Sequence, residues 1–535
     1  MSTLQGTRGL VRLILRRDRW LLPLWVLLLA LLPVYQAAAI DQLYSTPAQL
    51  RDLYGTVVST PGLLAMLGPV FGATLGAITV WRSGIVFVIV GLASLFTVIR
   101  HTRTDEEAGR RELLGATVVG RNAPLAAALL VTFAADLLLG ALLAAGMLGL
   151  GLPAAGSLAY GLSMTAVGVV FAAVGAVTAQ LAEGAGRARG IGLGVLGLAY
   201  LLRAAGDTGG SDSGLGWLSW LSPIGWSQQT RAYAGERWWV LALPAVLLVV
   251  LVAAAFALLA RRDVGAGIVQ ARPGPASAAP SLRSPLALAW RLQRASLLAW
   301  TAGLAVMGAV IGSVADSVNH MGGESAGLKD LLQRLGGEKA LSDAYIASAM
   351  VVFALAAAGY GIQATLRLRA EEEGLRAESV LATSVGRLQW AGSHLLFGLL
   401  GPAVALLAAG LAEGVVYGLV GGDVGHELPR VLAGALVQLP AVLVLSGVAM
   451  ALFGLLPRLT PVSWAALAVS AFLVLLGPLV RLSQWLLDLA PFSHIPKVPG
   501  AAVSATPLVW LLAAAAALAA AGLGGFRRRD LAGGA

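Results

Sequence analysis

RTDEEAGRRELLGATVVGR spans residues 103–121 of the chain, and RAEEEGLRAESVLATSVGR spans residues 369–387. The two stretches align without a gap at an offset of 266, and ten of their nineteen positions are identical. Their charge is conspicuous because only 12% of the chain's 535 residues are charged. A charged sequence that recurs half a chain length later indicates that the protein contains two related halves.

Three further pairs of short segments recur in the same order and at nearly the same offset. They are Arg16, Arg19 and Trp25 with Arg291, Arg294 and Trp300; WLSWLSPIGW at 217–226 with WLLDLAPFSH at 485–494; and ARRDVGAG at 260–267 with RRRDLAGG at 527–534. Between the halves, ARPGPASAAPS at 271–281 is too rich in proline to pack as a helix or strand. The sequence therefore predicts a first half at 1–260, a Pro/Ala/Ser linker at 261–284 and a second half at 285–535.

The composition indicates a membrane protein. Hydrophobic residues make up 58% of the chain, and its charged fraction is half of the roughly 25% that is typical of soluble domains. Apolar runs of about 20 residues, the length needed to cross a bilayer, recur throughout. We predict an all-α polytopic membrane protein with about twelve transmembrane helices in two parallel six-helix repeats. The expected spans are 20–40, 78–99, 122–150, 157–179, 191–206, 238–260, 297–314, 346–366, 389–415, 431–456, 462–480 and 505–524.

The positive charge is distributed as membrane topology requires, and this argues against nucleic acid as a partner. The segments between spans that the layout assigns to the cytoplasm hold 26 of the 37 Lys and Arg residues. This asymmetry predicts cytoplasmic N- and C-termini. The N-terminal arginines predict an interfacial amphipathic helix followed by a retained first span, not a cleaved signal peptide. With no cysteine in the chain, disulfides and thiolate metal sites are excluded.

Each charged motif falls between the second and third spans of its half. Acid-first pairs at i,i+4, such as Glu106–Arg110, Glu107–Arg111 and Glu372–Arg376, predict one short helix along the cytoplasmic surface in each copy. Such a helix can be a solvated loop helix. Alternatively, a cytoplasmic partner binds both copies of the motif, and the simplest partner of this kind is a dimer. The candidate contact residues are Arg103, Glu106, Glu107, Arg110, Glu112, Arg121, Arg369, Glu372, Glu373, Arg376, Glu378 and Arg387.

An amphipathic N-terminal helix followed by a charged helix after the second span resembles the type-2 ABC exporter permeases. RHTRTDEEAGRRELL at 100–114 and AYLLRAAGD at 199–207 look like the actinobacterial permeases identified as polyketide-antibiotic exporters of the tetronasin type. The resemblance covers essentially the whole chain and implies a bacterial inner (plasma) membrane location. The second motif departs from the pattern, with Leu375 for Gly109 and Ala377 for Arg111.

The resemblance implies an ATP-driven efflux permease for amphipathic or hydrophobic compounds of the antibiotic or multidrug type. Two copies of a separate ABC ATPase would contact the charged helices, with ATP and Mg bound by that partner. The resemblance also implies external re-entrant segments, which would contain Pro223 and Trp226 in the first half and Pro491 and His494 in the second.

The absence of a phosphate-binding loop agrees with a separate ATPase. The lysines are Lys329, Lys339 and Lys497, and none of them precedes Ser or Thr. The chain therefore lacks the G-x-x-x-x-G-K-[ST] motif, and we expect it to bind no cofactor and to be no enzyme. The five histidines are scattered and predict no metal site. The alternative function is a proton-coupled secondary multidrug transporter of the major facilitator kind, since EAGRR superficially resembles that family's cytoplasmic turn.

Several polar residues lie within or near the predicted spans. Asp136 is expected in mid-span, either contacting a polar or cationic substrate group or bonding Thr132 or a neighbouring helix. Glu413 is expected to be interfacial, and Arg203 to pair with Asp207 one turn on. A group of five tryptophans suits an external aromatic belt or, alternatively, a substrate box. They are Trp217, Trp220, Trp226, Trp238 and Trp239.

Overall fold

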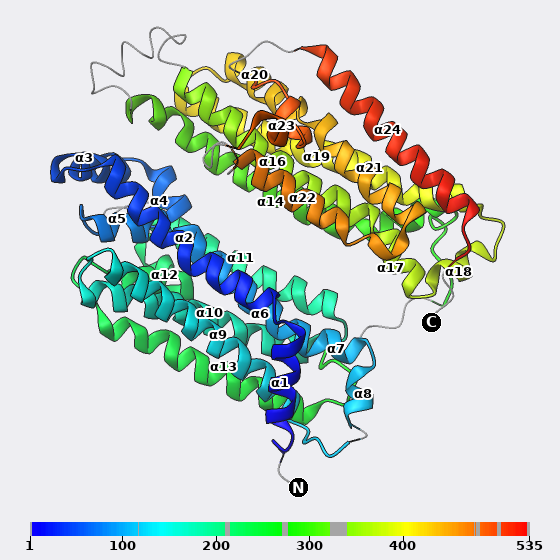
Figure 1. Ribbon diagram of the computed structural model, residues 1–535, viewed down its shortest axis with the longest axis horizontal. Helices are drawn as coiled ribbons and strands as arrows, with labels where there is room; N and C mark the ends of the chain where they lie inside the picture. The colour runs from blue at the N-terminus through cyan, green and yellow to red at the C-terminus, as the bar shows by residue number, and fades with distance from the viewer. Residues whose placement is uncertain are drawn as a thin grey trace. The chain divides into compact units, whose positions relative to one another are not determined.

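The computed structural model describes residues 3–115, 117–208, 214–269, 276–321, 340–475, 477, 482–499 and 504–531. Contacts between residues divide the chain into two units, Met1–Gly274 and Pro275–Ala535. The division lies inside the linker predicted at 261–284, of which residues 270–275 are outside the described part. Figure 1 shows both units as bundles of long helices, and within the described residues the one extended pairing is an isolated bridge between Ala182 and Val269.

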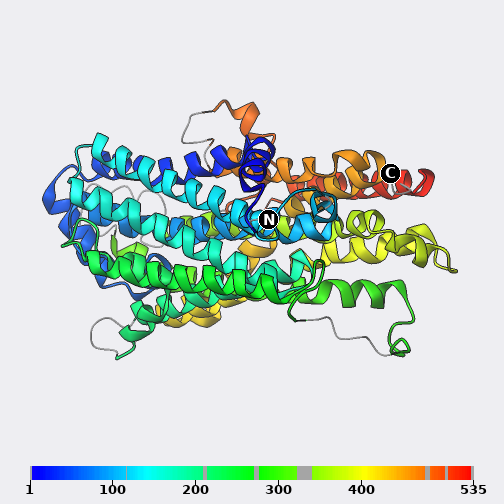
Figure 2. The same cartoon turned by 90° about the horizontal axis from the view of Figure 1, so that it is seen from below.

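In its described residues, the first unit contains six long helical stretches with shorter helices at their ends. Its elements are α1 (Thr7–Arg17), α2 (Leu21–Leu43), α3 (Pro47–Val58), α4 (Pro61–Leu67), α5 (Leu75–Arg82), α6 (Gly84–His101), α7 (Arg103–Glu107), α8 (Arg110–Gly115), α9 (Ala123–Gly149), α10 (Ala154–Leu181), α11 (Ala185–Thr208), η1 (Gly216–Leu221), α12 (Pro223–Gln229), η2 (Trp238–Leu241) and α13 (Ala242–Arg261). Figure 2 shows its long helices, coloured blue to green, running side by side.

Helix α10 is the centre of the first unit, because it packs against α6, α9, α11 and α13. Small residues allow its close approach to α9. A Cβ at Gly140 would meet the carbonyl of Gly161, so the two backbones touch where both residues lack a side chain. The predicted N-terminal amphipathic helix forms α1, which buries Leu10 and Ile14 and packs against α9, and its interfacial position stays a prediction.

Among the described residues, the second unit contains two helices longer than any in the first, α14 with 37 residues and α19 with 35. Its elements are α14 (Pro285–Met321), α16 (Ala340–Thr365), α17 (Arg367–Glu373), α18 (Arg376–Leu381), α19 (Arg387–Gly421), α20 (Val424–Leu436), α21 (Leu439–Leu455), η3 (Pro457–Leu459), α22 (Val462–Leu475), α23 (Gln484–Leu487), η4 (Pro491–His494) and α24 (Ala505–Arg528). The core lies where α19 packs against α14, α16 and α20, and where α21 packs against α24.

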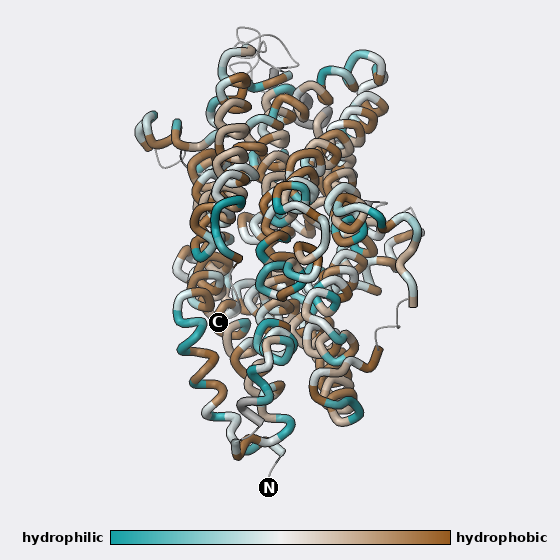
Figure 3. The backbone as a smooth tube through the Cα atoms, turned by 90° about the vertical axis from the view of Figure 1, so that its right-hand side faces the viewer, coloured by the Kyte–Doolittle hydropathy of each residue, from teal (hydrophilic) through white to brown (hydrophobic). Residues whose placement is uncertain are grey.

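The all-α polytopic prediction is confirmed. Within the described residues, eleven helical stretches are long and apolar enough to cross a membrane. Figure 3 shows brown, hydrophobic colour along the long helices and teal at many of their ends and connections. The predicted span at 462–480 corresponds to α22, which has 14 residues and is shorter than the others. Residues 476 and 478–481 of that predicted span lie outside the described part.

Candidate functional site at the two charged motifs

Each charged motif forms two short helices joined by a tight turn, not the single helix that the sequence predicts. In the first unit the turn separates α7 from α8, and Gly109 has φ +69. In the second unit it separates α17 from α18, and Leu375 has φ +56. Both residues adopt the left-handed backbone conformation, which ends an α-helix. The two halves thus use the same turn although one of them has no glycine there.

The left-handed turn changes which charges meet. Arg111 bonds Glu106 at 3.1 Å, and Arg110 contacts Asp105. In the second unit the Nε of Arg376 donates to Glu371 at 2.7 Å. Each arginine therefore reaches a carboxylate five residues earlier in the chain. The prediction of i,i+4 pairs for Arg110, Arg111 and Arg376 is wrong, because it assumed a helix without a break.

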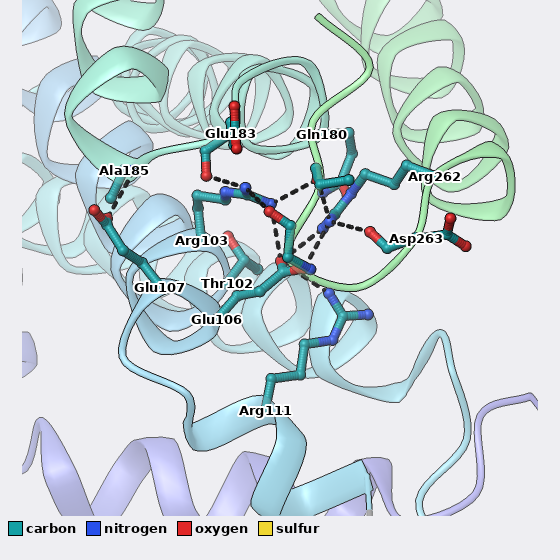
Figure 4. Close-up of polar contacts among 12 residues, drawn as sticks. Thr102, Arg103, Glu106, Glu107, Arg111, Gln180, Glu183, Ala185, Arg262 and Asp263 are labelled. Carbon is teal, nitrogen blue, oxygen red and sulfur yellow. Dashed lines mark hydrogen bonds and ion pairs between the residues drawn. The ribbon is translucent and has the colours of Figure 1, made fainter. Parts of the chain in front are cut away.

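Glu106 is the centre of a buried network in the first unit (Figure 4). It is 7% exposed. The guanidinium of Arg262 donates to both carboxylate oxygens, Nη1 to Oε1 and Nη2 to Oε2, each at 2.7 Å. The backbone N–H of Gly265 donates to Oε1 at 2.7 Å, and Arg103 forms an ion pair at 3.3 Å. With Arg111 included, three guanidinium groups and one amide surround a single carboxylate.

Arg103 ties the same network to backbone carbonyls. Its guanidinium donates to the carbonyls of Ala266 at 2.9 Å and Gly265 at 2.7 Å, and also to that of Glu183. Arg103 is almost completely buried. Its role is therefore to satisfy carbonyls of two loops, which argues against its being a residue that an outside partner touches.

The residues after α13 fold back over the end of α10. The Nε of Arg262 donates to the side-chain oxygen of Gln180 at 2.8 Å. The N–H groups of Ile268 and Val269 donate to the carbonyls of Gln180 and Leu181 at 3.1 and 2.9 Å. These bonds satisfy carbonyls that a helix end otherwise leaves free, and they bring the last helix of the unit against the charged motif.

The second unit repeats the central pair with different surroundings. Glu372 is 3% exposed. The Nη1 and Nη2 of Arg529 donate to its two carboxylate oxygens at 2.6 and 2.7 Å. Arg369 lies farther away, with its Nη1 at 3.8 Å. The guanidinium of Arg529 also lies over the rings of Phe453 and Phe526, at 5.0 and 5.1 Å from the ring centres.

A second arginine secures the carbonyl of the first in both units. Arg121 Nη2 donates to the carbonyl of Arg262 at 2.6 Å and to that of Leu259 at 2.9 Å. Arg387 Nη1 donates to the carbonyl of Arg529 at 2.6 Å. The charged motif and the terminal Arg-Arg-Asp segment, two of the repeated sequences, therefore contact each other in each half. Sequence reasoning missed the roles of Arg262 and Arg529, although their repetition at 260–267 and 527–534 was the available signal.

The other predicted contact residues lie at the surface. Glu112 and Glu378 are exposed. The carboxylate of Glu107 accepts a bond from the N–H of Ala185 at 2.9 Å and so caps the first turn of α11. The side chain of Glu373 is 61% exposed and pairs with Arg369 of its own helix at 2.8 Å. Unlike these exposed acids, Glu106 and Glu372 are committed to contacts inside the protein.

Asp136 is fully buried in the first unit. Its Oδ1 accepts a hydrogen bond from the hydroxyl of Ser94 on α6 at 2.7 Å, and it lies against Gly168 of α10. The hydroxyl of Thr132 instead bonds the carbonyl of Ala128. Of the predicted alternatives, the structure shows the bond to a neighbouring helix. Contact with cargo stays a prediction.

The Pro-centred segments contain short helices in both units. In the first, Pro223 begins α12, which the hydroxyl of Ser222 caps, and Trp226 donates from its ring nitrogen to the carbonyl of Trp220. In the second, Pro491 begins η4, and the ring of His494 lies 2.9 Å from the carbonyl of Asp488. Their re-entrant placement in the membrane stays a prediction.

Three other residues or groups singled out in the sequence have clear surroundings in the structure. Arg203 and Asp207 form an ion pair at 3.6 Å, as predicted. Glu413 is completely buried within the second unit, and its position at the membrane interface stays a prediction. Trp217, Trp238 and Trp239 are exposed, which favours an aromatic belt over a closed substrate box.

A cavity of about 290 Å³ lies in the second unit beside α17. Its lining combines polar and apolar side chains: Leu292, Gln293, Ser296, Gln363, Ala364, Leu366, Arg367, Ala370 and Trp464. Within the described part of the chain, no cluster of His, Asp and Glu side chains is arranged to hold a metal ion.

Known proteins resemble the whole chain. A family model described as the C-terminal domain of the multidrug efflux system permease Rv1217c matches residues 282–527. The multidrug efflux system permease protein Rv1217c of Mycobacterium tuberculosis (strain ATCC 25618 / H37Rv) is 48% identical over 531 residues, which cover 99% of this chain and 96% of that protein. With eleven apolar helices of spanning length in the described residues, the similarity defines a multi-pass membrane efflux permease. The chain belongs to the family of the permease Rv1217c.

Proposed function

We propose that this chain is the membrane-spanning subunit of an ATP-driven efflux system, energised by two copies of a separate ABC ATPase. The observation that carries the proposal is the duplicated motif. Both copies have the same left-handed turn and the same buried carboxylate–guanidinium pair, yet both present exposed charges on their outer side. A surface built twice in this way suits a partner that binds as two copies.

The division between buried and exposed residues assigns different roles within each motif. Glu106 and Glu372 fix the shape of the turn, and the exposed side chains contact the ATPase. The contact residues are Glu107, Arg110 and Glu112 in the first motif and Glu373, Arg376 and Glu378 in the second. ATP and Mg belong to the partner in this proposal, and the motifs and both termini lie on the cytoplasmic side of a bacterial inner membrane.

The proposed cargo is a small amphipathic or hydrophobic compound. The name of the relative, a multidrug efflux permease, supports this class. The mixed lining of the 290 Å³ cavity also supports it, because Gln293, Gln363 and Arg367 lie beside Leu366 and Trp464. Sites for small molecules commonly combine an apolar lining with a few polar groups.

The test is reconstitution of the permease in lipid with a candidate ABC ATPase from the same organism, with ethidium as an amphipathic probe. We expect the two proteins to purify together and ethidium transport to require ATP hydrolysis. An ATPase whose catalytic residue is mutated is the control. Ethidium transport driven by a proton gradient without any ATPase would overturn the proposal and favour a secondary transporter.

A further inference from the structure

We propose that Arg262 and Arg529 are positioning residues that join each charged motif to the last membrane helix of its unit. The pair of Glu106 with Arg262 is called the first ion-pair link, and the pair of Glu372 with Arg529 the second. Through these links, displacement of α7 or α17 would move α13 or α24. This inference rests on the proposed function, because the ATPase supplies the displacement.

The position of the two arginines in their helices supports a linking role. Arg262 is the C-cap residue of α13, and Arg529 is the C-cap residue of α24. Both have extended backbone, with ψ of 152 and 156. The helix ends at this residue in both units, and both guanidinium groups reach the motif. The same residue of each last helix thus makes the same contact.

The chemistry of the links makes them stiff. Each is bidentate, with all four bonds between 2.6 and 2.7 Å. Paired N–H···O bonds from one guanidinium fix both the distance and the orientation of the carboxylate. Because Glu106 and Glu372 are buried, water does not compete for these bonds. A shift of the motif is therefore transmitted to the arginine.

The contact is also held from the side of the arginine backbone. Arg121 and Arg387, which close the two motifs, donate to the carbonyls of Arg262 and Arg529. Each motif consequently forms hydrogen bonds to both the side chain and the main-chain carbonyl of the same arginine. A pair that only neutralised a buried charge would not require this second bond, and its occurrence in both units supports a mechanical role.

The two links differ in how far they are enclosed. The side chain of Arg262 is 3% exposed, whereas that of Arg529 is 15% exposed. Substitution of Arg529 is the safer experiment, because the second link is less enclosed. The neighbouring Arg528 is exposed and provides a matched control with the same change in charge.

The first measurement does not need the ATPase. The chain has no cysteine, so spin labels can be attached at Ser379→Cys in α18 and Arg527→Cys in α24, both exposed positions. We expect a narrow distance distribution between the labels, and a broad one in Arg529→Gln. The Arg528→Gln control should remain narrow. An unchanged narrow distribution in Arg529→Gln would overturn the link.

The second measurement tests coupling in the reconstituted complex with ethidium. In Arg529→Gln we expect ATPase binding and ATP hydrolysis within about twofold of wild type, and at least a tenfold fall in ethidium moved per ATP hydrolysed. Arg529→Lys keeps the charge but loses the bidentate geometry. Its ethidium transport per ATP hydrolysed should therefore lie between the values for wild type and Arg529→Gln. Parallel loss of hydrolysis and transport, or no loss of either, would overturn the coupling role. Failure of the wild-type chain to bind the ATPase would instead refute the proposed function. The distances between the spin labels would still show whether Arg529 joins the motif to α24.

Discussion

The first motif is enclosed by the protein, whereas the second is more open. In the first, Arg111 closes over Glu106 and Glu107 caps α11. In the second, Ala377 replaces that arginine, and Leu375 projects from the turn with 49% of its surface exposed. The pair between carboxylate and arginine is common to both. The comparison teaches that the internal pair is the constant requirement, whereas the outer surface keeps exposed charges in both motifs but differs in the residues around the turn.

The starts of the two units differ in the same direction. In the first, α1 and α2 are separate helices, and Asp18 between them bonds the ring of His101 at 2.6 Å and pairs with Arg100 at 3.0 Å. In the second, α14 runs without a break from Pro285 to Met321. In the first unit, the residue between its first two helices therefore contacts the end of α6, next to the charged motif.

The largest expected effect is at Glu106. Glu106→Gln removes the carboxylate that Arg103, Arg111 and Arg262 share, and leaves buried guanidinium groups without the carboxylate that they all contact. Breaking a buried ion pair from one side costs about 3–5 kcal/mol. Thermal unfolding in detergent, followed by circular dichroism, would measure the loss. The exposed Glu112→Gln is the control, and an equal effect of both substitutions would contradict the enclosed network.

Glu372→Gln should lower the free energy of unfolding by less than Glu106→Gln does. Arg529 retains the faces of Phe453 and Phe526 and some contact with solvent, so losing the carboxylate is expected to cost about 1.5–3 kcal/mol, the range for hydrogen bonds to charged groups. The same unfolding measurement applies, with Glu378→Gln as the control. A loss as large as that of Glu106→Gln would refute the distinction between an enclosed and an open motif.

Substitutions at the exposed acids test docking. Glu373→Ala should weaken capture of the ATPase by roughly three- to tenfold, as expected for an interface residue worth about 1 kcal/mol, and leave membrane insertion intact. Glu107→Ala should weaken capture similarly and also cost about 0.5–1 kcal/mol in stability, because it removes the cap of α11. Capture at wild-type level by both variants would argue against docking at the motifs.

The smallest effects are expected at the turns. Leu375→Gly should stabilise the second unit by about 0.5–1 kcal/mol, because glycine adopts the left-handed conformation without steric cost. Gly109→Ala should destabilise the first unit by about 1 kcal/mol for the same reason. Gly186→Ala, in a helix with open space around it, is the control and should not be destabilising. Unfolding temperatures would show whether the signs are opposite.

Hydropathy and repetition predicted the general fold, because both depend on patterns along the chain. These patterns identified the helices of spanning length, and the i,i+4 spacing placed Arg203 beside Asp207. They failed at the turns because helical periodicity assumes continuous helix, and Leu375 gives no local signal for a left-handed residue. They did not indicate that Glu413 is buried in the protein, because position along a span does not reveal which side of the helix faces a neighbour.

The candidate site was only half predictable for a similar reason. The charged motifs were evident from their composition, but their partners Arg262 and Arg529 lie 156 and 157 residues farther along the chain. No period of helix or strand connects positions so far apart. The repetition of the Arg-Arg-Asp segment marked them as important, and only the three-dimensional arrangement showed what they contact.

The contact between the charged motif and the last helix is completed within each unit, and this suggests how such a chain could arise. Each unit supplies its own acid and its own arginine, so neither needs the other to complete this contact. A gene divided within the Pro/Ala/Ser run would encode two polypeptides that each retain the contact. Fusion of two ancestral genes at this point would thus have required no redesign of either product.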